Sequence, residues 1–465
     1  MRSNSFTDNL SALLFPLVNA GGEVYEVGGP VRDKLMQRAH KDYDVICRKL
    51  TIEQITKILS PYGKIATVGK SFGITKFSPH KNSEIEIDIA LPRKERSTGT
   101  HHRDFDVNFD PNLSIEEDLE RRDFTINAMA MLLPDGKIID PFGGKNDIEA
   151  KLIRQVFPKT FEEDPLRLIR AIQFATRFNF TIEPVTWAAV CENAKLIETI
   201  SGERISAELV KIMAAEKPSI GFDLLFESGI LKYILPELVA LKGIEQDKQP
   251  GDDVYAHTMR VLDAARKDPE IDNKGNLELL FAALLHDTGK EKTSQYHEPT
   301  QRIVFFGHQL VSARIAKRLM KNLKLSSVGV NSDTVVTLIE HHMFETKASF
   351  TDRAIRRFVA KIGKDLISLL MDLRLADNRG GKHPNGIKGV LRLKSRIKEE
   401  LAKKPPFGAK DLAINGNDLI KLDISEGPQI GQILNHLVEL VLDYPQKNER
   451  DVLLALVKEK IKNET

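Results

Sequence analysis

The stretch Gly28-Gly29-Pro30-Val31-Arg32-Asp33 decides how the first third of this chain is interpreted. It follows the apolar segment Glu23–Val27, which is typical of a strand, and it opens a helical stretch over residues 30–38. Two glycines let the backbone approach a phosphate closely, and a helix N-terminus favours an anion. By itself a Gly-Gly turn before a helix is usually only a turn, so neighbouring residues must decide between the two interpretations.

Acidic residues on neighbouring predicted strands supply a second observation. Asp42 and Asp44 lie at i and i+2 of one strand, so both carboxylates point to the same face. On another strand, alternation puts Glu84, Glu86 and Asp88 on one face. An isolated Asp-x-Asp is more often a solvated strand edge. Three acids beside a glycine turn instead predict a two-metal phosphoryl-transfer centre.

The chain changes character near residue 160. Before it, predicted strands at 23–27, 43–46, 65–68, 74–77 and 85–91 alternate with predicted helices at 30–38 and 52–59. This pattern indicates a small α/β domain with a mixed sheet. Beyond Glu163, apolar residues recur at i, i+3 and i+4, and convincing strands disappear. The expected fold class is therefore α+β, an α/β head followed by an all-α body.

Length and composition exclude several classes. At about 150 residues a domain, 465 residues suggest roughly three domains. No apolar run approaches the roughly 18 residues that span a bilayer, so we expect no membrane role. Two cysteines, Cys47 and Cys191, exclude a disulfide scaffold and fit a reducing cytosol. We expect a cytoplasmic protein.

The net charge is only +2, from 68 Lys and Arg against 66 Asp and Glu. A dedicated nucleic-acid coat would be far more basic, so any RNA contact must come from local patches. One basic stretch covers residues 381–410, with Lys382, Lys388, Arg392, Lys394, Arg396, Lys398, Lys403, Lys404 and Lys410. A second comprises Arg314, Lys317, Arg318, Lys321 and Lys324. Each alone fits a solvated helix face almost as well as a phosphate contact.

Seven motifs in order resemble those of the class II tRNA nucleotidyltransferases, which add CCA, and of the related bacterial poly(A) polymerases. They cover the chain from about residue 25 to 180, and residues 416–434 resemble the family's C-terminal segment more weakly. The motifs are Gly28-Gly29-x-Val31-Arg32-Asp33, Asp42-x-Asp44, and residues 68–73, 88–95, 121–130, 140–144 and 163–171. The resemblance implies a nucleotidyltransferase head on the α/β domain.

Roles for individual residues follow from this resemblance. It implies that Asp42 and Asp44 hold two Mg²⁺ ions, and that Asp88, the third carboxylate, polarises the RNA 3′-hydroxyl. Clustered carboxylates suit phosphoryl transfer, which depends on charge neutralisation and in-line positioning. The remaining nucleotide-binding residues would be Gly28, Gly29, Arg32, Arg122, Asp123, Asn127, Asp164, Arg167 and Arg170.

The segment Glu163-Asp164-Pro165-x-Arg167 bears on base choice. Asp164 and Arg167, at i and i+3, share a helix face. Cytosine and adenine both present an amine donor beside a ring-nitrogen acceptor, which a carboxylate and a guanidinium complement. Uracil and guanine present the opposite pattern. In isolation, the pair would indicate a helix cap with a weak salt bridge. Because six other motifs of the family precede it in the chain, it instead predicts selection of C and A without a template.

The member of the family is indicated by two stretches. Residues 69–77 lack the basic, aromatic pattern usual in the poly(A) polymerases, and residues 97–117 form a long polar linker. Enzymes of the family that add only CC tend to lack such a loop. Full CCA addition from CTP and ATP is the first expectation. Addition of the terminal A alone is the next, and poly(A) synthesis is a further alternative.

A second set of residues resembles the ligands of the HD phosphohydrolase superfamily. His257, His286, Asp287 and Asp377 match its metal-ligand pattern, and imidazoles with carboxylates are transition-metal ligands. Lys290 matches too, and His308 with His341 or His342 would be accessory. The resemblance implies a divalent metal and 2′,3′-cyclic phosphodiesterase, 2′-nucleotidase or phosphatase activity. The alternatives are an HD fold kept as a spacer, and an HD hydrolase with a non-catalytic RNA-binding head.

These observations predict four domains. Residues 1–155 form the catalytic head, 156–247 the helical base-recognition and RNA-binding region, 248–380 the HD domain, and 381–465 a helical tail in contact with tRNA. The expected partners are tRNA, CTP and ATP, with no DNA. The sequence does not distinguish a monomer from a homodimer.

Overall fold

A computed structural model describes residues 4–39, 43–68, 74–80, 84–97, 105–246, 252–346, 350–381 and 386–464. Asp42, residues 69–73, residues 98–104 and Lys382 lie outside these ranges. The chain forms two compact units. The first comprises Met1–Ala215 with Ile220–Ile234, and the second Glu216–Ser219 with Leu235–Thr465. The four predicted domains are a finer division, which stays a prediction.

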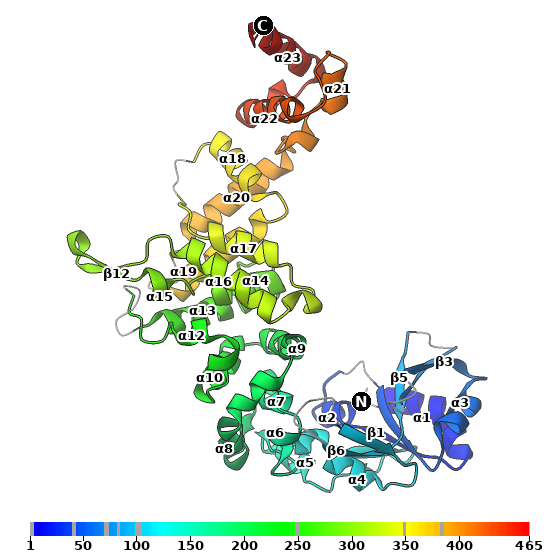
Figure 1. Cartoon of the computed structure of the whole chain (residues 1–465). Coiled ribbons are helices and arrows are strands. Elements are labelled where there is room, and N and C mark those ends of the chain that lie inside the picture. Colours follow the sequence, from blue (N-terminus) through cyan, green and yellow to red (C-terminus); the bar gives the residue numbers. More distant parts are fainter. Residues whose placement is uncertain are drawn as a thin grey trace. The chain divides into compact units, whose positions relative to one another are not determined.

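The first unit is built on a seven-stranded mixed sheet (Figure 1). Its strands are β1 (Glu23–Val27), β2 (Tyr43–Arg48), β3 (Gly63–Val68), β4 (Ile74–Pro79), β5 (Ile87–Ala90), β8 (Ala130–Leu133) and β9 (Ile138–Ile139). Their order is β3-β4-β5-β2-β1-β8-β9. The β2–β5 pair is parallel and the other pairs are antiparallel. The predicted α+β class and mixed sheet are confirmed.

Helices cover this sheet and continue beyond it. They are α1 (Asn4–Asn19), α2 (Gly29–Leu35), α3 (Ile52–Leu59), α4 (Ile115–Glu120), α5 (Gly144–Glu149), α6 (Thr160–Glu163), α7 (Leu166–Phe178), α8 (Pro184–Glu192), α9 (Gly202–Met213), α10 (Pro218–Glu227) and α11 (Leu231–Ile234). Leu14 of α1 and Ile55 of α3 share a core with Val24 of β1. Tyr25, the next residue of β1, belongs to a second core with α4. Neighbouring residues of a strand face opposite sides of the sheet, so the sheet has an apolar core on each side of β1.

Several short strands were not expected from the sequence. The segment predicted as the polar linker contains β7 (Phe105–Phe109), paired with β6 (Arg93–Ser97), and part of α4, so an unstructured linker over 97–117 was wrong. Strands also occur beyond Glu163, namely β11 (Thr181–Ile182), paired with β10 (Leu152–Ile153), and the hairpin of β12 (Gln295–His297) and β13 (Arg302–Val304). With two or three residues each, they are too short to show alternation.

The second unit is largely helical. Its helices are α12 (Pro236–Val239), α13 (Val254–Lys267), α14 (Leu277–Leu285), α15 (Lys290–Thr293), α16 (His308–Asn322), α17 (Ser332–His341), α18 (Asp352–Ile362), α19 (Ile367–Gly380), α20 (Lys388–Ala402), α21 (Gly416–Ile420), α22 (Pro428–Asp443) and α23 (Arg450–Glu464). All residues of α14 from Leu279 to Leu285 are buried, so this helix is central. The last three helices share a separate apolar core that includes Leu437 and Leu453.

Part of the basic stretch 381–410 is structural, which corrects its interpretation as a surface for RNA. Lys394 is buried, and its Nζ donates to Asp372 at 2.7 Å. Arg396 pairs with Asp352, and Lys398 pairs with Asp272 at 2.9 Å. These cations are held by carboxylates of the same unit, so they contribute less to an attractive field than a count of charges suggests. Among the described helices, none has the length and apolar character of a membrane span.

Candidate active site and metal centre

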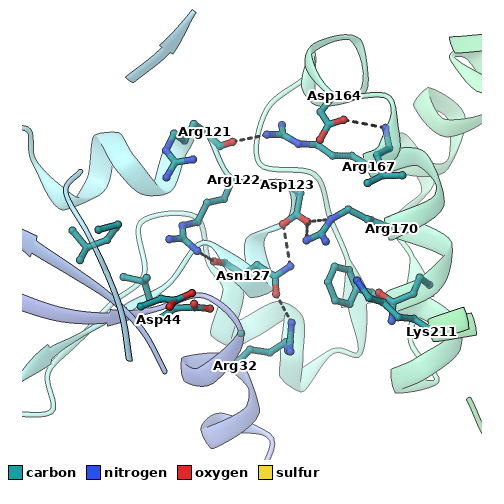
Figure 2. A pocket seen from close by; sticks show the side chains of 18 of the residues that line it. Arg32, Asp44, Arg121, Arg122, Asp123, Asn127, Asp164, Arg167, Arg170 and Lys211 are labelled. Atoms are coloured by element: carbon teal, nitrogen blue, oxygen red, sulfur yellow. Dashed lines mark hydrogen bonds and ion pairs between the residues drawn. The ribbon is translucent and has the colours of Figure 1, made fainter. Parts of the chain in front are cut away.

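A pocket of about 650 Å³ in the first unit gathers most of the residues predicted for the head. Nine basic side chains and four carboxylates line it, which favours a polyanionic ligand. In Figure 2, Asp44 and Asp164 lie on opposite sides of this pocket, with Asp123 between them. The predicted residues that line it are Gly29, Arg32, Asp44, Asp88, Arg122, Asp123, Asn127, Asp164, Arg167 and Arg170. Most of the prediction therefore converges in space.

Two carboxylates meet on adjacent parallel strands. Asp44 of β2 lies directly opposite Asp88 of β5 in the register of the sheet. Like charges in this position repel unless a cation lies between them. Oδ1 of Asp88 is buried, and its one polar contact among the described residues is a long ion pair with Nζ of Lys76 of β4 at 3.4 Å. A carboxylate oxygen that is held this weakly fits a ligand of a hard divalent cation.

The glycine turn adopts the conformation that its sequence predicts. Gly28 has φ 74°, in the left-handed region that favours glycine, and precedes α2. A Cβ atom there would lie 2.5 Å from Nη1 of Arg122, so a larger residue would displace this guanidinium. Gly29 lines the pocket and Gly28 does not, so the contribution of Gly28 is to leave room for the side chain of Arg122.

Asp123 connects the two sides of the pocket. Its Oδ1 accepts from Nδ2 of Asn127 at 3.0 Å, and its Oδ2 accepts from Nε of Arg170 at 2.8 Å. Asn127 in turn accepts from the buried Arg32 through Oδ1 at 2.5 Å. Burial would raise the pKa of Asp123, but the charge of Arg170 and the hydrogen bond from Asn127 hold that pKa below its usual value. The carboxylate is therefore ionised, and it orients Arg170 directly and Arg32 through Asn127.

Asp164 and Arg167, the pair predicted to read the base, each bond to a different neighbour instead of to each other. Nη2 of Arg204, on α9, donates to both oxygens of Asp164 at 3.2 and 3.0 Å. Arg167 donates to Oγ1 of Thr160 at 2.8 Å. It also donates to the carbonyl oxygen of Arg121 at 2.8 Å (Figure 2). Both predicted residues line the pocket, but each is fixed by a different neighbour.

Arg204 is a site residue that sequence reasoning missed. Its Nη1 is buried and has no hydrogen-bond partner within the described part of the chain. Gln173, Lys211 and Arg93 also line the pocket and were not predicted. Arg204 and Lys211 lie on α9, a helix without any recognised motif, so only the tertiary fold places them here.

The second unit brings the predicted HD residues together in one buried cluster. Nε2 of His257 lies 3.1 Å from Oδ1 of Asp377 and 3.5 Å from Oδ2 of Asp287. Nε2 of His286 lies 3.1 Å from Oδ2 of Asp287. On the other side, Nε2 of His308 lies 3.3 Å from Oδ1 of Asp287. Asp287 thus stands between two groups of imidazoles.

His342, and not His341, completes this cluster. Nε2 of His342 lies 3.4 Å from Nε2 of His308, and the residue is 1% exposed. Two groups can each hold a metal ion, His257 with His286 and Asp287, and Asp287 with His308 and His342. Burial and the charge of His286 lower the pKa of His342 to about 3, so its imidazole is neutral at physiological pH, as a metal ligand must be.

All four imidazoles are oriented in the same way. Their Nδ1 atoms lie 2.7 to 3.0 Å from the carbonyl oxygens of Gly380, Ala283, Phe305 and Ile339, for His257, His286, His308 and His342 respectively. A carbonyl only accepts, so each Nδ1 carries a proton and each Nε2 is directed into the cluster, where a neutral imidazole can present its lone pair to a metal. Nε2 of His286 is buried and makes no hydrogen bond to a described residue. This donor set fits a divalent transition metal.

Family models match three parts of the chain. A poly(A) polymerase head domain matches residues 24–154, a probable RNA- and SrmB-binding site of polymerase A matches residues 179–241, and an HD domain matches residues 254–379.

Curated relatives and solved structures cover more of it. A multifunctional CCA protein of Haemophilus influenzae (strain PittGG) is 33% identical over 77% of this chain and 85% of its own length. One from Janthinobacterium sp. (strain Marseille) is 37% identical over 65% of this chain and 69% of its own. The crystal structure of the Bacillus stearothermophilus CCA-adding enzyme in complex with CTP has a TM-score of 0.70 at 24% identity, with 98% of each chain covered. The Thermotoga maritima CCA-adding enzyme complexed with tRNA has a TM-score of 0.57 at 24% identity over 97% of this chain and 95% of its own. At this identity the structures support the fold alone.

Proposed function

This chain belongs to the family of multifunctional CCA proteins, and we propose that it builds the CCA end of tRNA in the pocket of its first unit. It is a tRNA nucleotidyltransferase that uses CTP and ATP. The observation that carries the assignment of the site is the register of Asp44 opposite Asp88 beside a pocket rich in arginine. We infer that Asp42 joins these two carboxylates.

The chemistry is transfer of a nucleotidyl group. The terminal 3′-oxygen of the tRNA attacks the α-phosphorus of the nucleotide, the bond from Pα to the bridging oxygen breaks, and pyrophosphate leaves. Asp88 accepts the proton of the attacking hydroxyl. Arg32, Arg122 and Arg170 hold the triphosphate charge. Asp42 and Asp44 would hold Mg²⁺, which supplies neutralisation of the phosphate charge when bound.

Base choice would fall to Asp164, Arg167 and Arg204. Asp164 accepts from the exocyclic amine of cytosine or adenine, and Arg167 donates to the adjacent ring nitrogen. Arg204 already binds both oxygens of Asp164 and so fixes the plane of its carboxylate. A carboxylate has about four lone-pair sites, which leaves acceptor capacity for the base.

The variant Asp44→Asn tests the site. It keeps the size of the side chain and removes its charge, so we expect loss of CTP and ATP incorporation into tRNA lacking CCA by at least about 100-fold. Glu86→Gln is the matched control, because Glu86 pairs with Lys76, which also approaches Asp88, but does not line the pocket. Wild-type incorporation by Asp44→Asn would reject the assignment, and Asp42→Asn is expected to behave like Asp44→Asn.

We further propose that the HD cluster is a metal-dependent phosphohydrolase centre. The convergent Nε2 atoms favour this over a spacer, because a structural core has no use for four imidazoles oriented alike. His257, His286, Asp287 and Asp377 would hold a divalent metal, and Asp287, His308 and His342 a second. Bound metal would supply an activated water. In the reaction, water adds to phosphorus, one ester P–O bond breaks, and the released oxygen takes a proton from the water.

Metal analysis and hydrolysis test this second function. The purified protein is expected to bind a divalent metal and to hydrolyse adenosine 2′,3′-cyclic monophosphate, and Asp287→Asn is expected to lose both properties. Equal metal content and equal hydrolysis in wild type and variant would contradict the proposal.

The helical residues beyond the head are proposed to contact tRNA. Arg314, Lys317 and Lys321 lie on α16, and these cations suit a phosphate backbone recognised by shape. We propose domain boundaries near residues 155, 247 and 380, within a cytoplasmic protein.

A further inference from the structure

A buried carboxylate contacts the wall of the first unit's pocket from outside. Asp118 of α4 is 0% exposed and does not line the pocket. Its Oδ1 accepts from Nη2 of Arg121 at 2.9 Å, from Nε of Arg121 at 3.1 Å and from the backbone N–H of Arg93 at 3.2 Å. Its Oδ2 forms a longer ion pair with Nη2 of Arg122, at 3.6 Å. One carboxylate therefore contacts three residues that line the pocket.

The guanidinium of Arg122 is otherwise held weakly. Its Nη1 donates to the carbonyl oxygen of Asn127 at 3.4 Å, which is a long hydrogen bond. Its Nε is buried and has no hydrogen-bond partner among the described residues. The side chain points towards Asp44, one of the carboxylates proposed to hold a metal (Figure 2). The orientation of this guanidinium therefore depends on the charge of Asp118, which attracts its other terminal nitrogen.

The position of Asp118 suits a support for cations. Burial of a carboxylate is unfavourable unless its charge is compensated, and here two guanidiniums and a backbone N–H compensate it. Nine basic side chains line the pocket and repel one another when no ligand is bound. A carboxylate that contacts them from outside reduces this repulsion without facing a bound triphosphate. The cations are then fixed before the nucleotide arrives, which is the condition for electrostatic preorganisation.

We propose that Asp118 is a positioning residue for nucleotide addition, which holds the guanidiniums of Arg121 and Arg122 in place for the phosphates of the incoming nucleotide. It acts through these two arginines and touches no substrate, and Arg121 joins the phosphate-binding residues. Because CTP and ATP have the same triphosphate, Asp118 strengthens the binding of both equally and does not contribute to base choice. This inference rests on the assignment of the pocket proposed above.

Asp118→Asn tests the inference in the full-length protein, because asparagine keeps the size of the side chain and removes its charge. We expect KM for CTP and for ATP to rise together by about tenfold or more, while kcat changes by less than about twofold. The preference for CTP over UTP should stay unchanged. The carbonyl oxygen of Arg121 that accepts from Arg167 belongs to a backbone turn that the N–H of Arg122 closes on Leu119 at 3.1 Å.

Glu117→Gln is the matched control. Glu117 precedes Asp118 on the same helix and binds Lys94 and the backbone of Ser114 but, among the described residues, no arginine of the pocket. Its KM values should equal those of the wild type. In combination with Arg122→Gln, Asp118→Asn should raise KM by a smaller factor than it does alone. Fully additive effects, or a lower kcat and a lower calorimetric midpoint at unchanged KM, would show a merely structural role and overturn the inference.

Calorimetric titration with CTP and Mg²⁺ measures binding without turnover. Weaker binding by Asp118→Asn than by Glu117→Gln supports the inference, and equal binding overturns it. If the wild type binds CTP but adds no nucleotide, the proposed function fails while the titration still decides the role of Asp118. Absence of CTP binding by the wild type would overturn both.

Asp118→Glu carries the test if Asp118→Asn does not fold. Glutamate keeps the buried charge but moves both oxygens by one methylene, so the two guanidiniums are displaced. KM for CTP and ATP should again rise together, and unchanged values would overturn the inference.

Discussion

Arg204 holds the carboxylate proposed to read the base, although no sequence motif marks it. Its Nη2 contacts both oxygens of Asp164, whereas the i, i+3 pairing predicted Arg167 as the neighbour of that carboxylate. Helical spacing could predict that Asp164 and Arg167 face one pocket. It could not predict which third residue the fold brings from α9, because that depends on how α7 and α9 pack.

Arg204→Met is therefore expected to relax base choice. Without the guanidinium of Arg204, Asp164 is less well oriented to accept from the amine of cytosine. Binding of uracil does not improve, because uracil has no amine at this position. A charged hydrogen bond contributes about 1.5–3 kcal/mol, so the preference for CTP over UTP in kcat/KM should fall about tenfold or more, mainly through KM for CTP. Arg204→Lys should restore part of the preference.

Lys211→Met is the control for loss of charge alone. Lys211 lies on the same helix and lines the same pocket, but its Nζ donates to Glu208 at 2.8 Å and not to Asp164. Equal relaxation in both methionine variants, or an unchanged preference in Arg204→Met, would show that Arg204 does not orient Asp164.

At the scale of elements, the sequence predicted most of the sheet. The bounds of β1 and α3 were predicted without error, because each is a clear apolar pattern ended by a turn or a cap. β8 was missed, because its residues fall in a run that is buried on both faces and shows no alternation. Residues 98–104, part of the polar linker that indicated full CCA addition, lie outside the described residues.

A buried ion pair joins α19 and α20. Lys394 of α20 donates to Asp372 of α19, which is 0% exposed and also accepts from Asn273. Lys394→Met would leave a buried charge with fewer donors. We expect a loss of about 3–5 kcal/mol in the free energy of unfolding of the second unit, seen as a calorimetric midpoint lower by roughly 10 °C.

Lys398→Met on the same helix provides the comparison. Lys398 pairs with Asp272 at the surface, where both side chains are exposed, so the expected loss is only about 0–1 kcal/mol. Similar midpoints for the two variants would contradict the structural role assigned to Lys394.

At the scale of the whole molecule, the two proposed centres lie in separate compact units. Asp44→Asn is therefore expected to abolish nucleotide addition and to keep hydrolysis of the cyclic nucleotide, and Asp287→Asn the reverse. Both activities can be measured on the same preparations. Loss of both activities in either variant would show that the centres depend on each other.

The net charge of +2 also acquires a different meaning at this scale. The near-zero net charge coexists with an uneven distribution of charged residues. One pocket has nine basic side chains and four carboxylates, and a second site contains acids and imidazoles. The sequence could predict most members of both sites from motifs, but not Arg204. The common orientation of the four imidazoles, which argues for metal binding, depends on backbone carbonyls that only the fold positions.

Sequencing of 3′ ends tests the central claim most directly. The full-length protein is incubated with tRNA lacking CCA, together with CTP, ATP or both. The predicted result is addition of CC with CTP alone and of CCA, without further extension, when both are present. Addition of A only, a growing poly(A) tail, or unchanged ends in the presence of both nucleotides would contradict the assignment.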